Sequence, residues 1–366
     1  MRPEPARDEF DPSQLMSDAS LNRTTLAAID GADAGWVGRR AFELLSLEAL
    51  KRLCAEHGFA DGPQGVDAVA TALSEAGGFA PPAGLGKSVA TARAREVCAE
   101  YGRRLAHLVA SLITPGASVA WSPWRAAYLD YWSSIDHIWL GGGIAAILGD
   151  ELARTVRAEL ARFGARACDV AIAPHPSALA VIGAARTSRG AHSYKVALDF
   201  GHSMVKRGVA IARHGSLERL ELLPRLGSPS IDADPAPELV RNFVLDTIAD
   251  TCRAVQQRYP DVDPHVVASL ATYLTNGMPV DVHSLYRPLS GFTIAWVEGE
   301  LEQRIGHIVQ LTFLHDGTAA ARAVPAGGRA AVIMLGTAMG VGFRPLSDSE
   351  MWPLAPDLVV TAFFGG

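Results

Sequence analysis

The stretch Tyr194–Val209 constrains the fold more than any other part of the chain. In it an apolar run, Val196–Leu198, is followed by Asp199, and a second run of strand-forming residues begins at Val209. Two such runs separated by glycine and polar residues are typical of a β-hairpin. We therefore expect two paired strands with Asp199 close to the turn.

The residues of this turn favour phosphate as a ligand. Gly201 lets the backbone approach an anion closely, and the Ser203 hydroxyl and the turn amides can donate to phosphate oxygens. Lys206 adds a cation, and Asp199 can hold a Mg²⁺ ion that neutralises the remaining charge. Taken alone, the stretch fits an ordinary hairpin with polar turn residues equally well.

Length and charge bound the class of protein. The chain has 366 residues and a formal net charge of -6, without a sustained basic block. A chain of this length can form two lobes, each with its own hydrophobic core. Because a basic surface is the footprint of nucleic-acid binding, we expect small molecules rather than nucleic acid as partners.

Cysteine usage and hydropathy indicate a cytoplasmic protein. The first 21 residues lack the apolar core of a signal peptide, and no stretch has the apolar length that spans a bilayer. We therefore expect no membrane partner. The cysteines form no CxxC motif, so we expect reduced thiols and no structural zinc. They are Cys54, Cys98, Cys168 and Cys252.

A second glycine-rich stretch lies at the end of a predicted strand that begins at Ile135. Gly141, Gly142 and Gly143 follow its apolar residues, and a predicted helix continues to about Glu159. Backbone amides and the positive end of a helix converge at such a junction and favour a nucleotide. Any tight turn from strand to helix could use the same triplet.

Asp316 is the candidate general base. It follows the predicted strand Ile308–Phe313 and precedes an alanine-rich helix. A carboxylate there projects into the crevice where α/β sheets bind ligands. Alternatively, Asp316 caps the helix Gly317–Arg322, and the two roles can coexist.

A further glycine-rich turn follows the predicted strand Ala330–Leu335. It contains Gly336, Thr337 and Gly340, which combine flexible backbone with a hydroxyl.

Periodicity and turn residues predict the remaining elements. Helices are expected over Leu21–Ile29, Arg39–Glu56 (one helix or two short ones), Val66–Ala76, Ala90–Ile113, Ala178–Thr187 with Ser177 as its N-cap, Pro237–Tyr259 and Val297–Ile305. Strands are expected over Val170–Ala173, Leu217–Leu223, Val266–Leu274 and Leu358–Phe364.

The segment Gly116–Ser134 is unusually aromatic. Its aromatic residues are Trp121, Trp124, Tyr128, Tyr131 and Trp132. Such a density is typical of an interface or a lid. Packing beneath a long loop explains it equally well.

Together these motifs resemble a known superfamily. Strand-Asp-x-Gly-x-Ser-x-x-Lys, strand-Asp-Gly-x-Ala-Ala-Ala, strand-Gly-Thr-x-x-Gly-x-Gly and strand-Gly-Gly-Gly-helix are similar to the phosphate, catalytic and adenosine motifs of sugar kinases, heat-shock proteins and actin. The similarity is greatest to the ROK group of sugar kinases and repressors. The order differs, because the adenosine-type glycines precede the first phosphate turn here.

A circular permutation would explain this order. Gly35–Thr187 resembles the second half of the family, and Lys195–Gly342 resembles its first half. The bridge Ser188–Tyr194 would join the two ends, which is feasible because chain termini often lie close together.

The resemblance implies a set of site residues. Asp199, Gly201, Ser203 and Lys206 match the first phosphate turn, Gly336, Thr337 and Gly340 match the second, and Gly142 and Gly143 match the adenosine site. Asp316 matches the base that deprotonates a sugar hydroxyl, with ATP and Mg²⁺ as cofactors and Asp199 at the metal.

Three residues are candidates for the acceptor site. They are Asn276, His315 and Glu43. Asn276 also fits a turn role, and Glu43 also fits a solvent-facing helix start. The chain departs from the family in lacking the zinc-binding cysteines, in His315 where asparagine is usual, and in His202 where glycine is usual.

We therefore expect a two-lobed α/β protein with a circularly permuted, actin-like ATPase (ribonuclease H-like) fold. One lobe would contain residues 1–176 and 327–366, and the other 177–326. The predicted activity is ATP-dependent phosphoryl transfer to a sugar or polyol. The alternatives are a catalytically silent sensor that keeps the fold and an interaction protein. A homodimer that exchanges lobes is also compatible with the permuted order.

Overall fold

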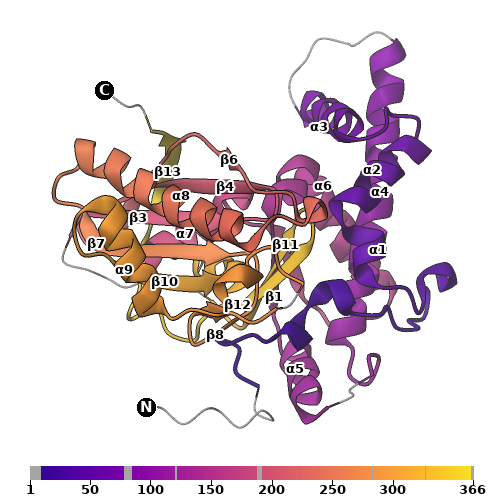
Figure 1. The fold of residues 1–366 in the computed structure, drawn as a ribbon. Helices are drawn as coiled ribbons and strands as arrows, with labels where there is room; N and C mark the ends of the chain where they lie inside the picture. The colour runs from indigo at the N-terminus through magenta and orange to yellow at the C-terminus, as the bar shows by residue number, and fades with distance from the viewer. Residues whose placement is uncertain are drawn as a thin grey trace. The chain divides into compact units, whose positions relative to one another are not determined.

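The computed structural model describes residues 10–77, 85–119, 122–187, 192–281, 283–325 and 327–363. They form two compact units (Figure 1). The first contains Phe10, Asp18–Ser177 and residues 327–341. The second contains Asp11–Ser17, Ala178–Pro325 and the described residues from Gly342 on. Both units combine helices with partly parallel sheets, so the predicted α/β class is confirmed.

The sheet of the first unit has the strand order β12-β11-β1-β2. Strand β1 (His137–Gly141) pairs in parallel with both β2 (Asp169–Ile172) and β11 (Ala330–Leu335). Strand β12 (Met339–Phe343) lies beside β11. The sheet therefore joins strands from the middle of the chain with strands from its C-terminal part.

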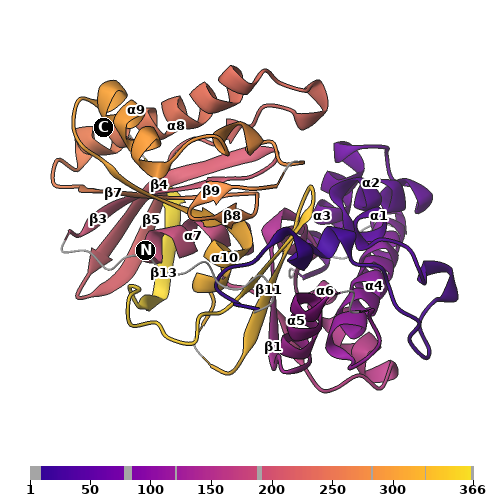
Figure 2. The same cartoon turned by 60° about the horizontal axis from the view of Figure 1, so that its bottom comes forward.

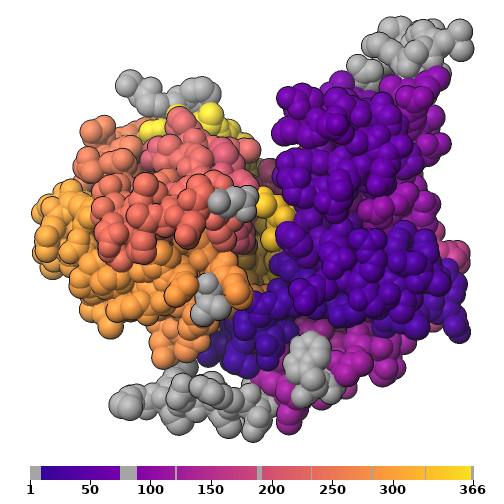
Figure 3. Space-filling view, turned by 45° about the vertical axis from the view of Figure 1, so that its right-hand side comes forward, coloured from indigo at the N-terminus to yellow at the C-terminus, as the bar shows by residue number. Residues whose placement is uncertain are grey.

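Helices pack around this first sheet. They are α1 (Ala41–Leu45), α2 (Leu47–Glu56), α3 (Pro63–Gly77), α4 (Leu85–Ile113), α5 (Pro123–Ser133) and α6 (Gly142–Arg162). The long helix α4 packs against α6 and α3. Figure 3 shows the indigo and purple segments before about residue 100 covering one face of this unit.

The second unit is built on a seven-stranded sheet with the order β10-β7-β3-β4-β5-β13, in which β6 also pairs with β4. Its strands are β3 (Tyr194–Phe200), β4 (Met204–Arg213), β5 (Ser216–Leu222), β6 (Leu226–Gly227), β7 (Asp263–Leu270), β10 (Gln310–His315) and β13 (Leu354–Ala362). Strands β3 and β4 form the predicted hairpin. Strands β7 and β10 run parallel to β3, so all three end at the same edge of the sheet.

Helices cover both faces of the second sheet (Figure 2). Helices α8 (Pro237–Arg258) and α9 (Ile294–Ile305) lie on one face, and α7 (Leu179–Arg186) and α10 (Asp316–Arg322) lie on the other. A Cβ atom on Gly183 would lie 1.6 Å from the carbonyl oxygen of Ala319. Only glycine therefore permits the close packing of α7 on α10.

Three sequence-based expectations about local structure are wrong. Leu21–Ile29 is not a helix: β-branched Thr25 bridges Arg40, and the Leu26 amide donates to the Arg39 carbonyl at 3.0 Å. Ser177 does not cap α7, because it lies within a 3₁₀ turn and Ala178 occupies the cap position.

The C-terminal strand also differs from expectation. Residues 327–366 were expected in one lobe, but β13 pairs in parallel with β5 in the second unit. Several predicted segments lie partly outside the described residues. They are the N-terminal tail, Trp121, the bridge Ser188–Tyr194 and the end of the last strand.

Candidate active site

Asp199 is held by two neighbouring strands. Its Oδ2 atom accepts a hydrogen bond from Lys206 Nζ at 2.9 Å, and its Oδ1 atom accepts one from Ser269 Oγ at 2.9 Å. Lys206 lies on β4 and Ser269 on β7, each directly opposite Asp199 in the strand register. The carboxylate is buried, and the ion pair with Lys206 compensates its charge.

The turn after Asp199 is held in one shape by side chains from other parts of the unit. The carbonyl of Gly201 accepts hydrogen bonds from Ser228 Oγ at 2.8 Å and Tyr286 Oη at 2.7 Å. A Cβ atom on Gly201 would lie 2.8 Å from the carbonyl oxygen of Met204. Gly201 is therefore required by the tightness of the turn, while Ser203 is exposed at its tip.

Asp316 opens α10 at the end of β10, and it shares an electrostatic environment with Asp199. Burial raises the pKa of Asp316 to about 6, and the nearby charge of Asp199 contributes to the rise. The charges of His202 and Lys206 lower the pKa of Asp316. The structure thus brings Asp199, Lys206 and Asp316 into one cluster at the carboxyl edge of the sheet.

His315 supports the start of α10. Its Nδ1 atom accepts a hydrogen bond from the Thr318 amide at 3.3 Å, so His315 is the N-cap residue. The ring stacks on Tyr273, with centroids 4.6 Å apart. Burial lowers the pKa of His315 to about 3, so the ring is neutral at ordinary pH.

This arrangement changes the interpretation of Asp316. The expected alternative, that Asp316 caps α10, is wrong because His315 fills the cap position. With Nδ1 as an acceptor, the ring proton of His315 is on Nε2, which lies 3.2 Å from Asp316 Oδ1. Asp316 also accepts a hydrogen bond from the Gly317 amide at 2.7 Å. The carboxylate is therefore oriented by its neighbours without serving as the cap.

The two glycine-rich turns of the first unit lie against each other. Gly142 begins α6 with φ of 90°, and a Cβ atom there would lie 2.2 Å from the carbonyl oxygen of Leu335 at the end of β11. Gly143 has no such neighbour within 4 Å and is exposed. Because β1 and β11 are parallel neighbours, the turn at Gly336 and the turn at Gly142 share one edge of the sheet.

The turn at Gly336 is anchored from the N-terminal part of the unit. The Gly336 carbonyl accepts from the Leu47 amide at 3.0 Å. The Asn22 side chain accepts from the Met339 amide and donates to the Met339 carbonyl, each at 2.8 Å. Thr337 and Gly340 lie in this anchored segment, beside Gly336 and Met339 respectively.

Two predicted acceptor residues stay outside these clusters. Glu43 is on α1 in the first unit, is exposed, and pairs with Arg39 at 3.3 Å. Asn276 is exposed between β8 (Leu274–Thr275) and β9 (Met278–Pro279) and has φ of 50°. The left-handed conformation is one that asparagine tolerates better than most residues. The solvent-facing and turn interpretations account for these two residues.

The aromatic segment packs internally. Helix α5 buries Trp124, Tyr128 and Trp132, and Trp124 and Tyr128 stack with centroids 5.4 Å apart. Phe10 packs edge-on against Trp124 and Tyr128. The structure therefore favours packing over an exposed interface for this part of the segment.

Sequence reasoning missed a cavity in the first unit. It has a volume of about 670 Å³ and is lined by residues of α3, α4 and α6, among them Arg95, Ala146 and Arg154. At Gly149, φ of 57° and ψ of -153° interrupt α6 beside the cavity. No sequence pattern marks such a cavity, because its walls come from three helices.

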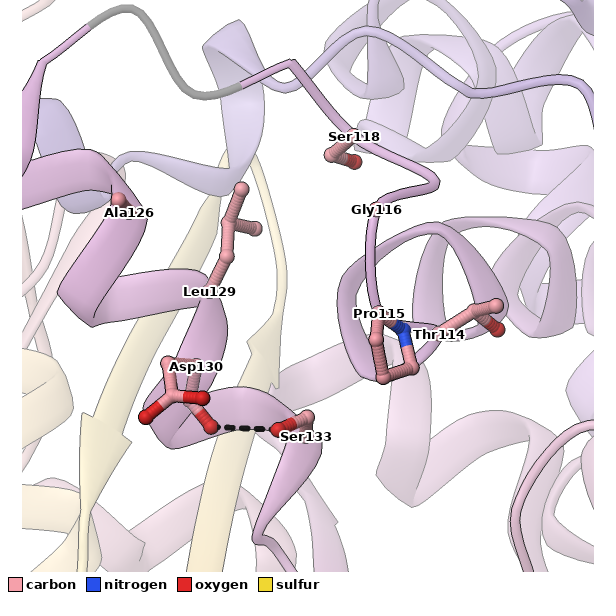
Figure 4. Close-up of a pocket in the computed structure, with 8 residues that line it drawn as sticks. All are labelled: Thr114, Pro115, Gly116, Ser118, Ala126, Leu129, Asp130 and Ser133. Carbon is pink, nitrogen blue, oxygen red and sulfur yellow. Dashed lines mark hydrogen bonds between the residues drawn. The ribbon is translucent and has the colours of Figure 1, made fainter.

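A second, smaller cavity of about 250 Å³ lies between the end of α4 and α5 (Figure 4). The Ser133 hydroxyl on its wall donates to the Asp130 carbonyl at 2.6 Å. Leu129 and Pro115 also line it. Nothing in this lining indicates a particular ligand.

Whether the site suits Mg²⁺ depends on the oxygen ligands that its side chains offer. Among the described residues there is no group of three or more His, Cys, Asp or Glu side chains that could hold a metal ion. Mg²⁺ commonly uses one or two carboxylates, several waters and substrate phosphates. Asp199 offers one such carboxylate, and its Oδ2 atom is engaged by Lys206 in this structure, so Mg²⁺ there would need nucleotide phosphates and waters as its other ligands.

Comparison with known proteins gives a partial structural match and no sequence match. No protein-family model matches the chain, and no curated protein sequence matches it. Among solved structures, the chain is similar to the ROK hexokinase from Thermus thermophilus, with 18% sequence identity and a TM-score of 0.29. The match covers 41% of this chain and 46% of the hexokinase chain, which is less than half of either. No helix in the described part of the chain is long and apolar enough to cross a membrane.

Proposed function

We propose that the chain is an ATP-dependent phosphotransferase that acts on a hydroxyl group of a sugar or polyol. The observation that carries this proposal is the placement of Asp199 and Asp316 at the ends of parallel strands of one sheet, where burial and the charge of Asp199 raise the pKa of Asp316 to about 6. A general base works best when its pKa is close to the operating pH. Asp316 meets this requirement because it is partly desolvated and feels the negative charge of Asp199.

Each residue of the cluster has a role in this proposal. Asp316 accepts the proton of the attacking hydroxyl, and His315 keeps Asp316 oriented through the start of α10. Asp199 would hold Mg²⁺, and the ion would supply positive charge near the transferring phosphoryl group. Lys206 leaves Asp199 and contacts phosphate oxygens, together with the amides of the turn at Gly201.

The first unit supplies the groups for the nucleotide. The turns at Gly336 and Gly142 present backbone amides, and α6 begins at the second of them. At a rise of about 1.5 Å per residue, the cavity residues Ala146–Leu148 follow Gly142 by roughly 6 to 9 Å along the helix axis. We assign the cavity of about 670 Å³ to the nucleoside of ATP, since small-molecule sites commonly have this size.

The order of the motifs is explained by the proposed circular permutation of an actin-like fold. In the second unit, α7 precedes β3 in the chain and packs against β3, β7 and α10. Helix α7 therefore ends shortly before β3, the first strand of this unit. In the proposed permutation, α7 corresponds to the former C-terminus and β3 to the former N-terminus, and the chain now joins them. The strand order of the second sheet is consistent with such a fold.

The direct test measures ATP consumption by the purified chain against a panel of sugars, amino sugars and polyols. Asp316→Asn should reduce acceptor-dependent turnover by at least about 100-fold, the usual contribution of a general base. Asp250→Asn is the matched control, because Asp250 is an exposed aspartate paired with Arg253 on α8. Acceptor-dependent turnover that survives Asp316→Asn would disprove the assignment of the base.

A catalytically silent sensor is the second candidate. The ion pair between Lys206 and Asp199 occupies the groups that should face phosphate and metal, which favours this alternative. A sensor should be stabilised against heat by ATP, since a ligand that binds only the native state raises its melting temperature. It should show no turnover with any acceptor.

A further inference from the structure

Three arginines of the second unit interact electrostatically with one another, two of them through Asp348. Arg186 lies at the end of α7, Arg322 at the end of α10, and Arg344 just after β12. We call these three residues the arginine cluster. None of them belongs to the glycine-rich turns or to the cluster of Asp199, Lys206 and Asp316.

Arg186 is the most buried member, with 4% of its side chain exposed. Its Nε atom donates to the Trp352 carbonyl at 2.7 Å, and its Nη1 atom donates to the Arg322 carbonyl. Its Nη2 atom lies 3.5 Å from Asp348 Oδ2. The carbonyls satisfy hydrogen bonds of Arg186 but carry no full negative charge.

Asp348 is the carboxylate that pairs with the arginine cluster. The same Oδ2 atom accepts from Arg344 Nη2 at 2.9 Å, so a single oxygen serves two guanidinium groups. Its other oxygen, Oδ1, is buried without a partner in the described residues. Glu350 favours the charged form of Arg322 from a distance, but it is exposed and forms no ion pair with Arg322 among the described residues.

Two donors of the cluster are also left over. The Nε atoms of Arg322 and Arg344 are buried and have no acceptor among the described residues. Burial lowers the pKa of Arg186 and of Arg322, and in each case a neighbouring arginine lowers the pKa further. Asp348 is the one carboxylate that pairs with these three guanidinium groups among the described residues, so the cluster keeps an excess of positive charge over its ion-pair partners.

We propose that the arginine cluster binds a compact oxyanion, a phosphate or carboxylate group, through Arg322 and Arg344. A buried charge is costly unless it is paired, and a buried donor is costly unless it is hydrogen-bonded. An oxyanion meets both needs, because guanidinium groups bind phosphate and carboxylate with charge-assisted hydrogen bonds.

The site is separate from the proposed catalytic cluster but shares a helix with it. Asp316 is the first residue of α10 and Arg322 the last, so about 10 Å of helix separates them. The inference does not depend on the proposed kinase activity. It is tested without any enzyme assay.

The test is thermal unfolding of the full chain at constant ionic strength, titrated with inorganic phosphate in one arm and acetate in the other. Specific binding gives a saturable rise in melting temperature, whereas general salt effects rise without saturation. Arg344→Gln and Arg322→Gln should weaken the binding at least tenfold. Arg253→Gln should leave it unchanged, because Arg253 is exposed on α8.

The hairpin turn at Gly201 is a rival phosphate site, and Lys206→Met separates the two. A saturable effect that survives Lys206→Met and is lost in Arg344→Gln supports the proposal, and the effective arm identifies phosphate or carboxylate. The proposal is overturned if neither anion gives a saturable effect, if the effect survives Arg344→Gln, or if Lys206→Met abolishes it. Should Arg344→Gln fail to fold, Arg344→Lys, which keeps the charge and loses the planar fork, must show the same tenfold weakening.

Discussion

Lys206 Nζ lies 2.9 Å from Asp199 Oδ2, and the two residues face each other directly across the β3–β4 pair. The positive charge of Lys206 also favours the ionised form of Asp316. One lysine therefore acts on both carboxylates of the candidate site.

Removing this lysine should change the pH dependence of the site. Lys206→Met withdraws a positive charge, so the pKa of Asp316 should rise above its present value of about 6. If ionised Asp316 is the base, the acidic limb of the pH–kcat profile should move to higher pH. An unchanged limb would mean that Lys206 does not act on the titrating group.

Asp316 should make the fold less stable at neutral pH. Its folded-state pKa of about 6 lies above the ordinary value of 3.8. The protonated carboxyl therefore stabilises the fold fully below about pH 4, and this contribution is lost as pH rises through about 6. Asp316→Asn should consequently be more stable than the parent at pH 8, by about 3 kcal/mol, with a smaller difference at pH 5.

Chemical denaturation at several pH values measures this difference. Asp250→Asn provides the control, because it removes an exposed carboxylate that lies on α8, outside the cluster. A difference between Asp316→Asn and the parent that is the same at pH 5 and pH 8 would contradict the electrostatic description of the cluster.

The two glycines at the start of α6 should differ sharply in their tolerance of alanine. In Gly142→Ala the new Cβ atom would meet the Leu335 backbone at 2.2 Å in a left-handed conformation, so the junction of β1, β11 and α6 must distort. We expect a loss of at least about 2 kcal/mol in unfolding free energy. Gly143→Ala, with no atom within 4 Å, should fold normally.

Asp348 should be critical for the C-terminal part of the second unit. Asp348→Asn removes the carboxylate that pairs with Arg186 and Arg344, and we expect a loss of at least about 2 kcal/mol in stability. Asp357→Asn is the control, since Asp357 is exposed on β13. Equal stability of the two variants in denaturant titration would show that Asp348 is dispensable.

Filling the cavity beside α6 should separate nucleotide binding from folding. Ala146 is exposed and lines the cavity, so Ala146→Trp should fill part of it without disturbing the core. Under the proposed function, the KM for ATP should rise at least tenfold. Ala161→Trp, at an exposed position of the same helix outside the cavity lining, should leave the KM unchanged.

The sequence predicted the parts of the fold that are determined locally. The β3–β4 hairpin, the junction of β1 with α6 and the strand before Asp316 all follow from short-range patterns of apolar and glycine residues. The helix prediction at Leu21–Ile29 failed because the Leu26 amide bonds to the Arg39 carbonyl and Thr25 bridges Arg40, more than ten positions along the chain. The apolar spacing within the segment does not identify these partners.

Long-range relationships were harder to predict. The pairing of β13 with β5 joins residues more than 130 positions apart, so no local pattern could identify its sheet. The role of His315 as the cap of α10 was missed because histidine is not a common N-cap residue. The buried arginine cluster was missed for the same reason as the cavity, since its members are close only after folding.

The central claim is that Asp316 acts as a base in ATP-dependent phosphoryl transfer, and acceptor-dependent ADP formation by the parent chain and by Asp316→Asn tests it most directly. The account predicts Mg²⁺-dependent ADP formation with at least one sugar or polyol, reduced at least about 100-fold by the substitution. ADP formation that no acceptor stimulates, or that is equal in the two chains, would contradict it.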